Sequence, residues 1–246
     1  MTLYFIGLGL GDERDITVKG LEAIKKADKV YLESYTSKLV KSSKEDLEKF
    51  YGKKIITADR ELVEKRAEDT ILKYAKDKDV AFLVIGDTFS ATTHIDLKIR
   101  ADELGIKTEM ISNTSILNAV GITGLDLYKF GRTTTIPFDN KNVKSPYDVV
   151  KNNLKNNLHT LVLLDLDPAS DKYMTVNEAV EYLLREGMPK DQLCVGCGGI
   201  GSEDAIIKAG KAKDIVKKKF KKFPQCLIIP SKLHFMEEEA LKKFKD

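Results

Sequence analysis

The chain has 246 residues, 42% of them hydrophobic and 32% charged, a globular composition that excludes an intrinsically disordered protein. Its formal charge of +3 is nearly balanced, so charge alone does not indicate a nucleic-acid-binding protein. The apolar runs are too short to span a bilayer, and residues 1–10 resemble a core strand instead of a signal peptide, so we expect no membrane association. Three cysteines, an odd number, predict no disulfide framework and a reducing, cytoplasmic location.

The whole chain alternates short apolar runs with helical patterns, which predicts an α/β fold with mostly parallel strands in both halves. In the first half, this pattern includes three helices. Thr17 is placed to cap a helix that runs to Ala27. Apolar side chains at helical spacing predict a further helix over residues 63–74, and another helix ends at Leu104 with Gly105 at its C′ position. The strands expected in this half span residues 3–8, 30–33, 79–85 and 108–111.

Residues 113–130 are rich in Gly, Asn, Ser and Thr, which makes them the best candidate for a domain junction. We therefore expect two α/β domains, residues 1–112 and residues 113–246. In the second domain, Thr175 and Glu178 have the spacing of a capping box that starts a helix. The strands expected in this half span residues 133–137, 159–164, 192–195 and 225–229, and the last helix begins near residue 235.

A glycine-rich loop follows the first expected strand, with Gly7, Gly9 and Gly11 at alternate positions. The dinucleotide fingerprint needs its third glycine one residue later and a helix directly after it, whereas polar residues 12–15 intervene here. We therefore disfavour a dinucleotide site. Two interpretations remain open, a tight turn between strand and helix, and a loop that lets another kind of ligand approach the backbone.

Residues 86–94 follow the most buried of the expected strands, at the sheet edge where open α/β folds bind ligands. Asp87 in this segment could pair with a cationic ligand or cap the next helix. His94 is expected to be a hydrogen-bonded residue at the start of that helix and not a ligand. No Ser-His-Asp pattern or metal-ligand pattern is present in the sequence, and no catalytic base can be named from it.

Two further patterns have ordinary explanations. Cys194 and Cys197 have C-x-x-C spacing, but residues three apart in a strand face opposite sides, so we expect buried free thiols and no metal site. Residues 208–222 carry eight lysines and one acidic residue, which is typical of a solvated face. The same run could also attract an acidic macromolecule, although few aromatic residues accompany it.

Several segments, spread over nearly the whole chain and arranged in the same order, resemble those of one family. On these segments the chain is similar to the diphthine synthases, within the tetrapyrrole methylase-like class of methyltransferases. They cover residues 4–11, 15–21, 31–37, 86–87, 91–94, 113–116, 118–121, 127–131, 159–161, 164–166 and 232–234.

The resemblance implies two α/β domains with S-adenosylmethionine in the cleft between them, usually in a homodimer. It also implies a protein substrate, translation elongation factor 2, whose modified histidine is methylated on its amine, and no direct nucleic-acid binding. Carried over segment by segment, the implied cofactor-contacting residues are Leu10, Asp87, Ser90, Ser115, Ile116, Leu166, Ala209 and His234.

The chain departs from the family pattern at two positions. Thr88 stands where the family commonly has proline, and a threonine there could cap the next helix. Gly199 stands where the family commonly has arginine, which leaves the contact with the substrate in question. Because several segments look like the eukaryotic type and no arginine at residue 199 would grip the substrate carboxylate, we hypothesise that methylation continues to the methyl ester.

Two other functions compete with this interpretation. A methylase acting on a corrin or porphyrin ring would need a broad apolar cleft, and methyl transfer to a tetrapyrrole would identify it. A non-enzymatic nucleic-acid-binding module, using residues 208–222, would show strongly salt-dependent binding and no response to S-adenosylmethionine.

Overall fold

The computed structural model describes residues 1–245, in two compact units that divide between Leu117 and Asn118. Residues 113–117 belong to the first unit by their contacts; the boundary expected after residue 112 stays a prediction. Among the described residues, no helix is long and apolar enough to cross a membrane.

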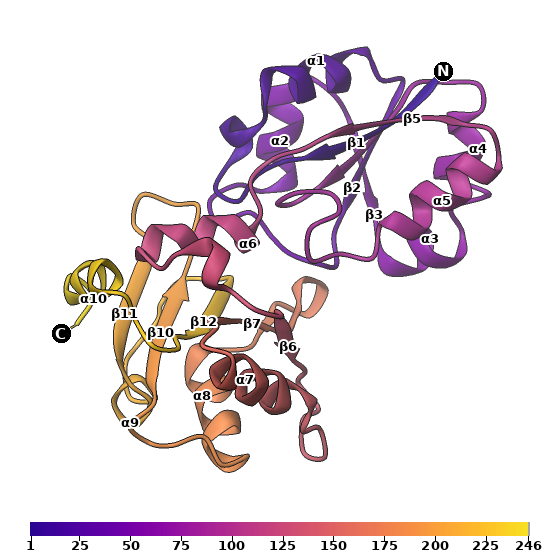
Figure 1. Ribbon diagram of the computed structural model, residues 1–246. Coiled ribbons are helices and arrows are strands. Elements are labelled where there is room, and N and C mark those ends of the chain that lie inside the picture. The colour runs from indigo at the N-terminus through magenta and orange to yellow at the C-terminus, as the bar shows by residue number, and fades with distance from the viewer. Residues whose placement is uncertain (246) are drawn as a thin grey trace. The chain divides into compact units, whose positions relative to one another are not determined.

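The first unit is a parallel five-stranded sheet with helices on both faces (Figure 1). One buried cluster packs α1 (Val18–Lys26) and α2 (Lys44–Tyr51) against the sheet around Ile24 and Leu47, and another packs α4 (Ile71–Ala75) and α5 (Ile95–Glu103) against the opposite face around Ile71 and Leu97. Its strands, in spatial order, are β3 (Ile55–Ala58), β2 (Lys29–Glu33), β4 (Val80–Val84), β1 (Thr2–Gly7) and β5 (Lys107–Ile111). Its helices are η1 (Glu13–Asp15), α1 (Val18–Lys26), α2 (Lys44–Tyr51), α3 (Arg60–Lys65), α4 (Ile71–Ala75) and α5 (Ile95–Glu103).

The second unit has a mixed sheet, so the expectation of mostly parallel strands is wrong for this half. Only β6 and β7 pair in parallel in this five-stranded sheet of the described chain, whereas β7, β12, β10 and β11 pair antiparallel. The order is β11 (Ile206–Lys211), β10 (Leu193–Gly198), β12 (Gln225–Ile229), β7 (Thr160–Leu164), β6 (Thr134–Ile136); β8 (Leu166–Asp167) and β9 (Lys172–Tyr173) form a separate pair. Its helices are α7 (Ser145–Lys155), η4 (Pro168–Ser170), α8 (Val176–Arg185), α9 (Ala212–Ile215) and α10 (Phe235–Lys242).

Three short helical turns link the strands on either side of the division between the units. They are α6 (Ile116–Ala119), η2 (Val120–Thr123) and η3 (Leu127–Lys129).

Several predicted details are confirmed. Thr17 caps α1 through the Gly20 N–H, and Thr175 and Glu178 form the predicted capping box of α8. Cys194 and Cys197 are buried free thiols in β10, and burial raises the pKa of Cys194 to about 12.

The helix expected over residues 63–74 is two helices, α3 and α4. Thr70 adopts φ −127° and ψ −97°, outside the helical region, and its hydroxyl donates to Arg66 O at 2.6 Å. This local hydrogen bond competes with a continuous helix. Val63 and Ile71 still pack in one core cluster, so the apolar spacing correctly predicted burial but not continuity.

Candidate functional site

Three loops meet at the carboxyl edge of the first sheet, where β1, β4 and β5 end. Gly9 in the first loop and Gly86 in the second exchange backbone hydrogen bonds of 3.1 and 2.8 Å. Both glycines have positive φ, 77° and 83°, which other residues adopt only with strain. The glycine loop is therefore a backbone-to-backbone contact and not a dinucleotide turn.

The carboxylate of Asp15 holds the first loop in place. Its Oδ2 accepts from the N–H groups of Gly11 at 2.7 Å and Leu10 at 3.2 Å. The Leu10 side chain borders Gly86, because a Cβ built on that glycine would lie 3.7 Å from Leu10 Cδ2. Asp15 thereby fixes the backbone of a residue in the candidate cofactor set.

Asp87, in the loop that follows β4, accepts hydrogen bonds from its own loop and from the loop after β5. Its Oδ1 accepts from Ser90 Oγ at 3.0 Å and Phe89 N at 3.3 Å, and its Oδ2 accepts from Asn113 N at 3.0 Å. It does not cap the following helix, since His94 occupies the N-cap position of α5. Asp87 and Ser90, predicted separately, are thus in direct contact.

Asn113 joins the first and third loops, and the sequence-based set omitted it. Its side-chain amide donates to Gly7 O and to Asp15 O, each at 3.0 Å. The sequence around Asn113 does not indicate this role, because the partners of its side chain lie about a hundred residues earlier. Only its place after β5 could have suggested it. Ser115, almost fully buried, lies beside Gly86 in the same assembly, and Ile116 begins α6.

Thr88 and His94 are buried behind this edge. Thr88 was expected to be able to cap the next helix, but its Oγ1 has no hydrogen-bond partner among the described residues. His94 Nδ1 contacts Thr88 O at 3.3 Å, and since a carbonyl only accepts, this nitrogen carries the proton. Its Nε2 then accepts from Tyr35 Oη at 3.3 Å. The expectation that His94 is a hydrogen-bonded histidine at a helix start is confirmed.

Replacing Thr88 with valine should stabilise the protein by about 1 kcal/mol. Valine has nearly the same shape and removes a buried hydroxyl that has lost its hydrogen bond to water. Urea unfolding measures the change in the free energy of unfolding. T88S keeps the hydroxyl and loses the methyl group, so it should be less stable than the wild type. A less stable T88V would show that the hydroxyl has a partner after all.

The remaining candidates lie in the second unit. Leu166 is in β8, Ala209 is in β11, and His234 caps α10 by accepting from Met236 N. β8 pairs only with β9, in a separate two-stranded sheet, so Ala209 and Leu166 do not lie in the same sheet. Ala209 donates its N–H to the carbonyl of Phe244, just after α10.

Gly199 has a positive φ of 66° in the turn after β10. Its N–H donates to Pro224 O at 2.9 Å, and its carbonyl accepts from Ser202 Oγ at 2.8 Å. An arginine would be strained in this backbone conformation. The departure at residue 199 therefore changes the turn as well as the side chain.

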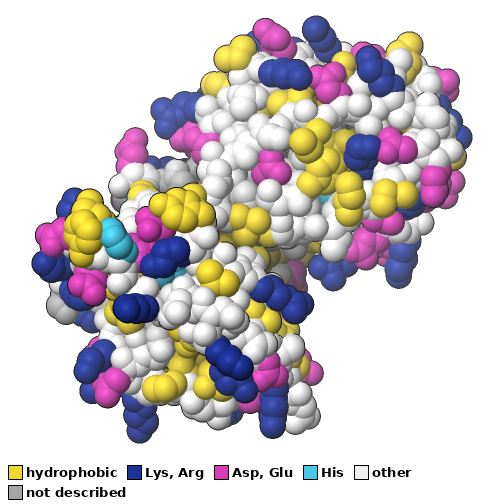
Figure 2. Space-filling view, viewed as in Figure 1, with side chains coloured by type: hydrophobic (Ala, Val, Ile, Leu, Met, Phe, Trp, Pro, Cys, Tyr) yellow, Lys and Arg dark blue, Asp and Glu magenta, His cyan; other side chains and the backbone are white. Residues whose placement is uncertain are grey.

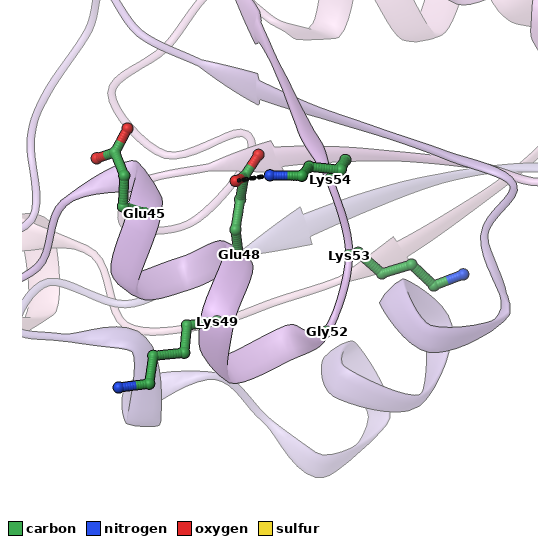
Figure 3. Close-up of a pocket in the computed structure, with 6 residues that line it drawn as sticks. All are labelled: Glu45, Glu48, Lys49, Gly52, Lys53 and Lys54. Atoms are coloured by element: carbon green, nitrogen blue, oxygen red, sulfur yellow. Dashed lines mark hydrogen bonds and ion pairs between the residues drawn. The ribbon is translucent and has the colours of Figure 1, made fainter.

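Two charged regions do not belong to the three loops of this edge. The groove beside α2 is lined by ordinary surface residues, and Glu48 pairs with Lys54 there at 3.0 Å (Figure 3). In the lysine run, Lys211 and Lys213 pair with Asp191. Neither region contains a residue of the candidate set other than Ala209, which is beside Lys208.

Comparisons with known proteins agree over most of the chain. The model of the Tetrapyrrole (Corrin/Porphyrin) Methylases matches residues 2–216. A probable diphthine methyl ester synthase of Arabidopsis thaliana is 47% identical in an alignment that covers 99% of this chain and 98% of the relative. A diphthine synthase of Methanocella arvoryzae is 46% identical, and that alignment covers 97% of this chain and 96% of the relative. The chain belongs to the diphthine synthase group of the tetrapyrrole methylase family.

Solved structures of this family share the fold. A crystal structure of diphthine synthase has a TM-score of 0.94 at 41% identity, covering 100% of this chain and 96% of the other. A putative diphthine synthase from Entamoeba histolytica has a TM-score of 0.90 at 42% identity, covering 100% of this chain and 98% of the other. The resemblance stated from sequence is confirmed, and the chain is a methyltransferase.

The carboxyl edge of the first unit suits the cofactor that this family implies, S-adenosylmethionine. Its polar groups include several that can accept hydrogen bonds: the carboxylate of Asp87, the hydroxyls of Ser90 and Ser115, and the carbonyl of Thr114 close to Gly86. Such groups favour a positively charged sulfonium, an amine and sugar hydroxyls. Among residues 1–245, no group of three or more His, Cys, Asp or Glu side chains could hold a metal ion.

Proposed function

We propose that this methyltransferase uses S-adenosylmethionine to methylate the modified histidine of translation elongation factor 2 in diphthamide biosynthesis, giving diphthine or its methyl ester. The observation that supports this most strongly is the full-length similarity, at 44–47% identity, to diphthine synthases and diphthine methyl ester synthases. A corrin or porphyrin substrate has only the broader family description in its favour.

The proposed cofactor residues are the set named from the sequence, with Asp87 as its electrostatic centre. When bound, S-adenosylmethionine supplies a methyl group on a positively charged sulfur. The protein's part is to orient the acceptor amine and exclude water, and alignment of reactants can contribute roughly 7–11 kcal/mol to such a step. Asp15 and Asn113 keep the glycine loop and Asp87 in place while this happens.

Mass spectrometry of elongation factor 2 after an exhaustive reaction tests the proposed substrate and product. We expect methyl groups on the modified histidine, with one of them labile to mild alkali, because no arginine at residue 199 holds the substrate carboxylate away from the cofactor. Transfer to a tetrapyrrole and none to the factor would refute the proposed substrate. N-methylation without an alkali-labile methyl would refute only the ester.

We also propose a cytoplasmic homodimer. An apolar surface on the second unit supports the dimer, with Ile122, Tyr128, Phe235 and Met236 exposed by 59, 87, 68 and 59%. Figure 2 shows hydrophobic side chains gathered in the α10 region. Exposed apolar surface of this kind is commonly covered by a partner. Light scattering on the purified chain measures the mass of the assembly directly.

Removing the Asp87 carboxylate should weaken S-adenosylmethionine binding at least 10-fold. D87A loses a negative charge near the proposed sulfonium site and leaves Asn113 N and Ser90 Oγ without their acceptor. Calorimetry with the cofactor and with its demethylated product measures the loss. D77A, a change in an exposed turn of the same unit, serves as the matched control. Equal affinity in D87A and wild type would assign Asp87 to the turn alone.

A further inference from the structure

The second unit contains a carboxylate that is completely removed from solvent. Glu237, in the first turn of α10, is 0% exposed. Its Oε1 accepts from His159 Nε2 at 2.8 Å and from Asp126 N at 3.0 Å. Its Oε2 accepts from His234 N at 2.7 Å and from Lys129 Nζ. Each carboxylate oxygen therefore has two donors.

A capping role alone does not explain the burial of Glu237. Glu178 occupies the same capping-box position in α8 and is exposed to solvent. Burying a carboxylate is costly unless it is fully hydrogen-bonded and paired with a cation, here Lys129. Burial alone would raise the pKa of Glu237, but its four donors outweigh burial and hold the pKa at about 2. The carboxylate therefore stays charged at working pH.

His159 extends this network to a turn of the backbone. Its Nδ1 accepts from Ser231 N at 2.9 Å, so the proton of the neutral ring is on Nε2, which donates to Glu237. Burial lowers the pKa of His159 and outweighs the contact with Glu237, which raises it. The neutral ring therefore needs only one tautomer to accept from Ser231 N and donate to Glu237.

The network fixes the turn at residues 231–234 from three sides. Ser231 N is held by His159, and His234 N is held by Glu237. Between them, the carbonyl of Lys232 accepts from Lys129 Nζ at 3.1 Å. Three of the four residues in the turn are therefore hydrogen-bonded to His159, Glu237 or Lys129. The exposed side chain of His234 thus extends from a backbone that this network holds in place.

We propose that Glu237, together with His159 and Lys129, acts as a positioning residue that presents His234 to S-adenosylmethionine. The inference rests on the proposed function, because His234 is a proposed cofactor contact. Rigid support of a binding group lowers the cost of ordering it when the ligand arrives. Loss of the support should therefore reduce cofactor affinity more than it reduces turnover at saturation.

The test compares E237Q with E178Q in the full chain. The glutamine nitrogen at residue 237 cannot accept, so two of the four donors lose their partner and the turn loosens. We expect the Kd and the KM for S-adenosylmethionine to rise about 10-fold, with kcat at saturation changed less than about twofold. E178Q makes the same chemical change in an exposed capping box, so it should leave both constants unchanged.

Two further variants keep the outcome decisive. If E237Q does not fold, K129M removes the partly exposed cation with its bonds to Glu237 and to Lys232 O but keeps the other three donors of the carboxylate, and it should raise the Kd about threefold. Wild-type affinity in folded E237Q or K129M, or an equal loss in E178Q, would overturn the inference. Wild-type cofactor affinity in H234A would also overturn the inference, because it would show that the His234 side chain does not contact S-adenosylmethionine. Methyl transfer by the wild type would in that case still support the proposed function.

Discussion

Replacing Gly7 with alanine should destabilise the first unit by about 2–3 kcal/mol and reduce cofactor binding at least 10-fold. A Cβ built on Gly7 would lie 2.7 Å from Gly86 O and 2.9 Å from Asn113 Cβ. Neither neighbour can move easily, because Gly86 is hydrogen-bonded to Gly9 and the Asn113 side chain donates hydrogen bonds to Gly7 O and Asp15 O. The added methyl group therefore forces apart all three loops of the site.

Urea unfolding and calorimetry with S-adenosylmethionine measure the two effects of G7A. Gly210 provides the matched control, since it is also a strand glycine and a Cβ there would meet Ile215 at an ordinary 3.5 Å. G210A should differ from the wild type by less than about 1 kcal/mol. If G7A unfolds like G210A and binds the cofactor normally, then the close approach of the loops is not required for the site.

Acid should destabilise the protein through His94, beginning above the pH at which most carboxylates titrate. Burial lowers the pKa of His94 to about 4, against the hydrogen bond to Thr88 O, which raises it. Its folded pKa is below the unfolded value, so the unfolded state takes up the proton first. The stability contributed by the neutral ring is present above about pH 6.5 and is lost as the pH falls toward 4, amounting to about 3 kcal/mol.

The difference between the wild type and H94Q isolates this effect from the other titrating groups. A glutamine amide can donate to Thr88 O and accept from Tyr35 Oη without binding a proton. We therefore expect urea unfolding between pH 7 and pH 4 to show a steeper loss of stability in the wild type than in H94Q. Parallel pH profiles for the two proteins would mean that His94 is not buried in the neutral form.

The local parts of the fold could be predicted from the sequence because their causes are local. The continuous apolar run of β4, the Thr17 cap and the Thr175–Glu178 capping box depend only on near neighbours. The strand β11 was missed because lysines and a glycine interrupt its apolar pattern, as is common in edge strands. The antiparallel pairing of the second sheet also escaped prediction, since α/β alternation does not determine strand direction.

The candidate site was partly predictable for a similar reason. A polar residue just after a buried strand marks a ligand-binding edge, and Asp87 could be found in this way. Asp15 and Asn113 could not, because their importance comes from hydrogen bonds that the fold creates between three loops. The same holds for Glu237, whose ordinary place in a capping box gives no sign of its burial or of His159 beneath it.

The strand order of the first sheet also bears on how the chain folds as it is synthesised. β1 pairs with β4, which begins at Val80, and with β5, which begins at Lys107. β1 therefore leaves the ribosome without a partner in its sheet until β4, about 70 residues later, has also emerged, and contacts so distant along the chain form slowly. In contrast, β10 and β11 are close in sequence and can pair as soon as both are synthesised. We expect the nascent first unit to depend on chaperones most strongly before β5 emerges.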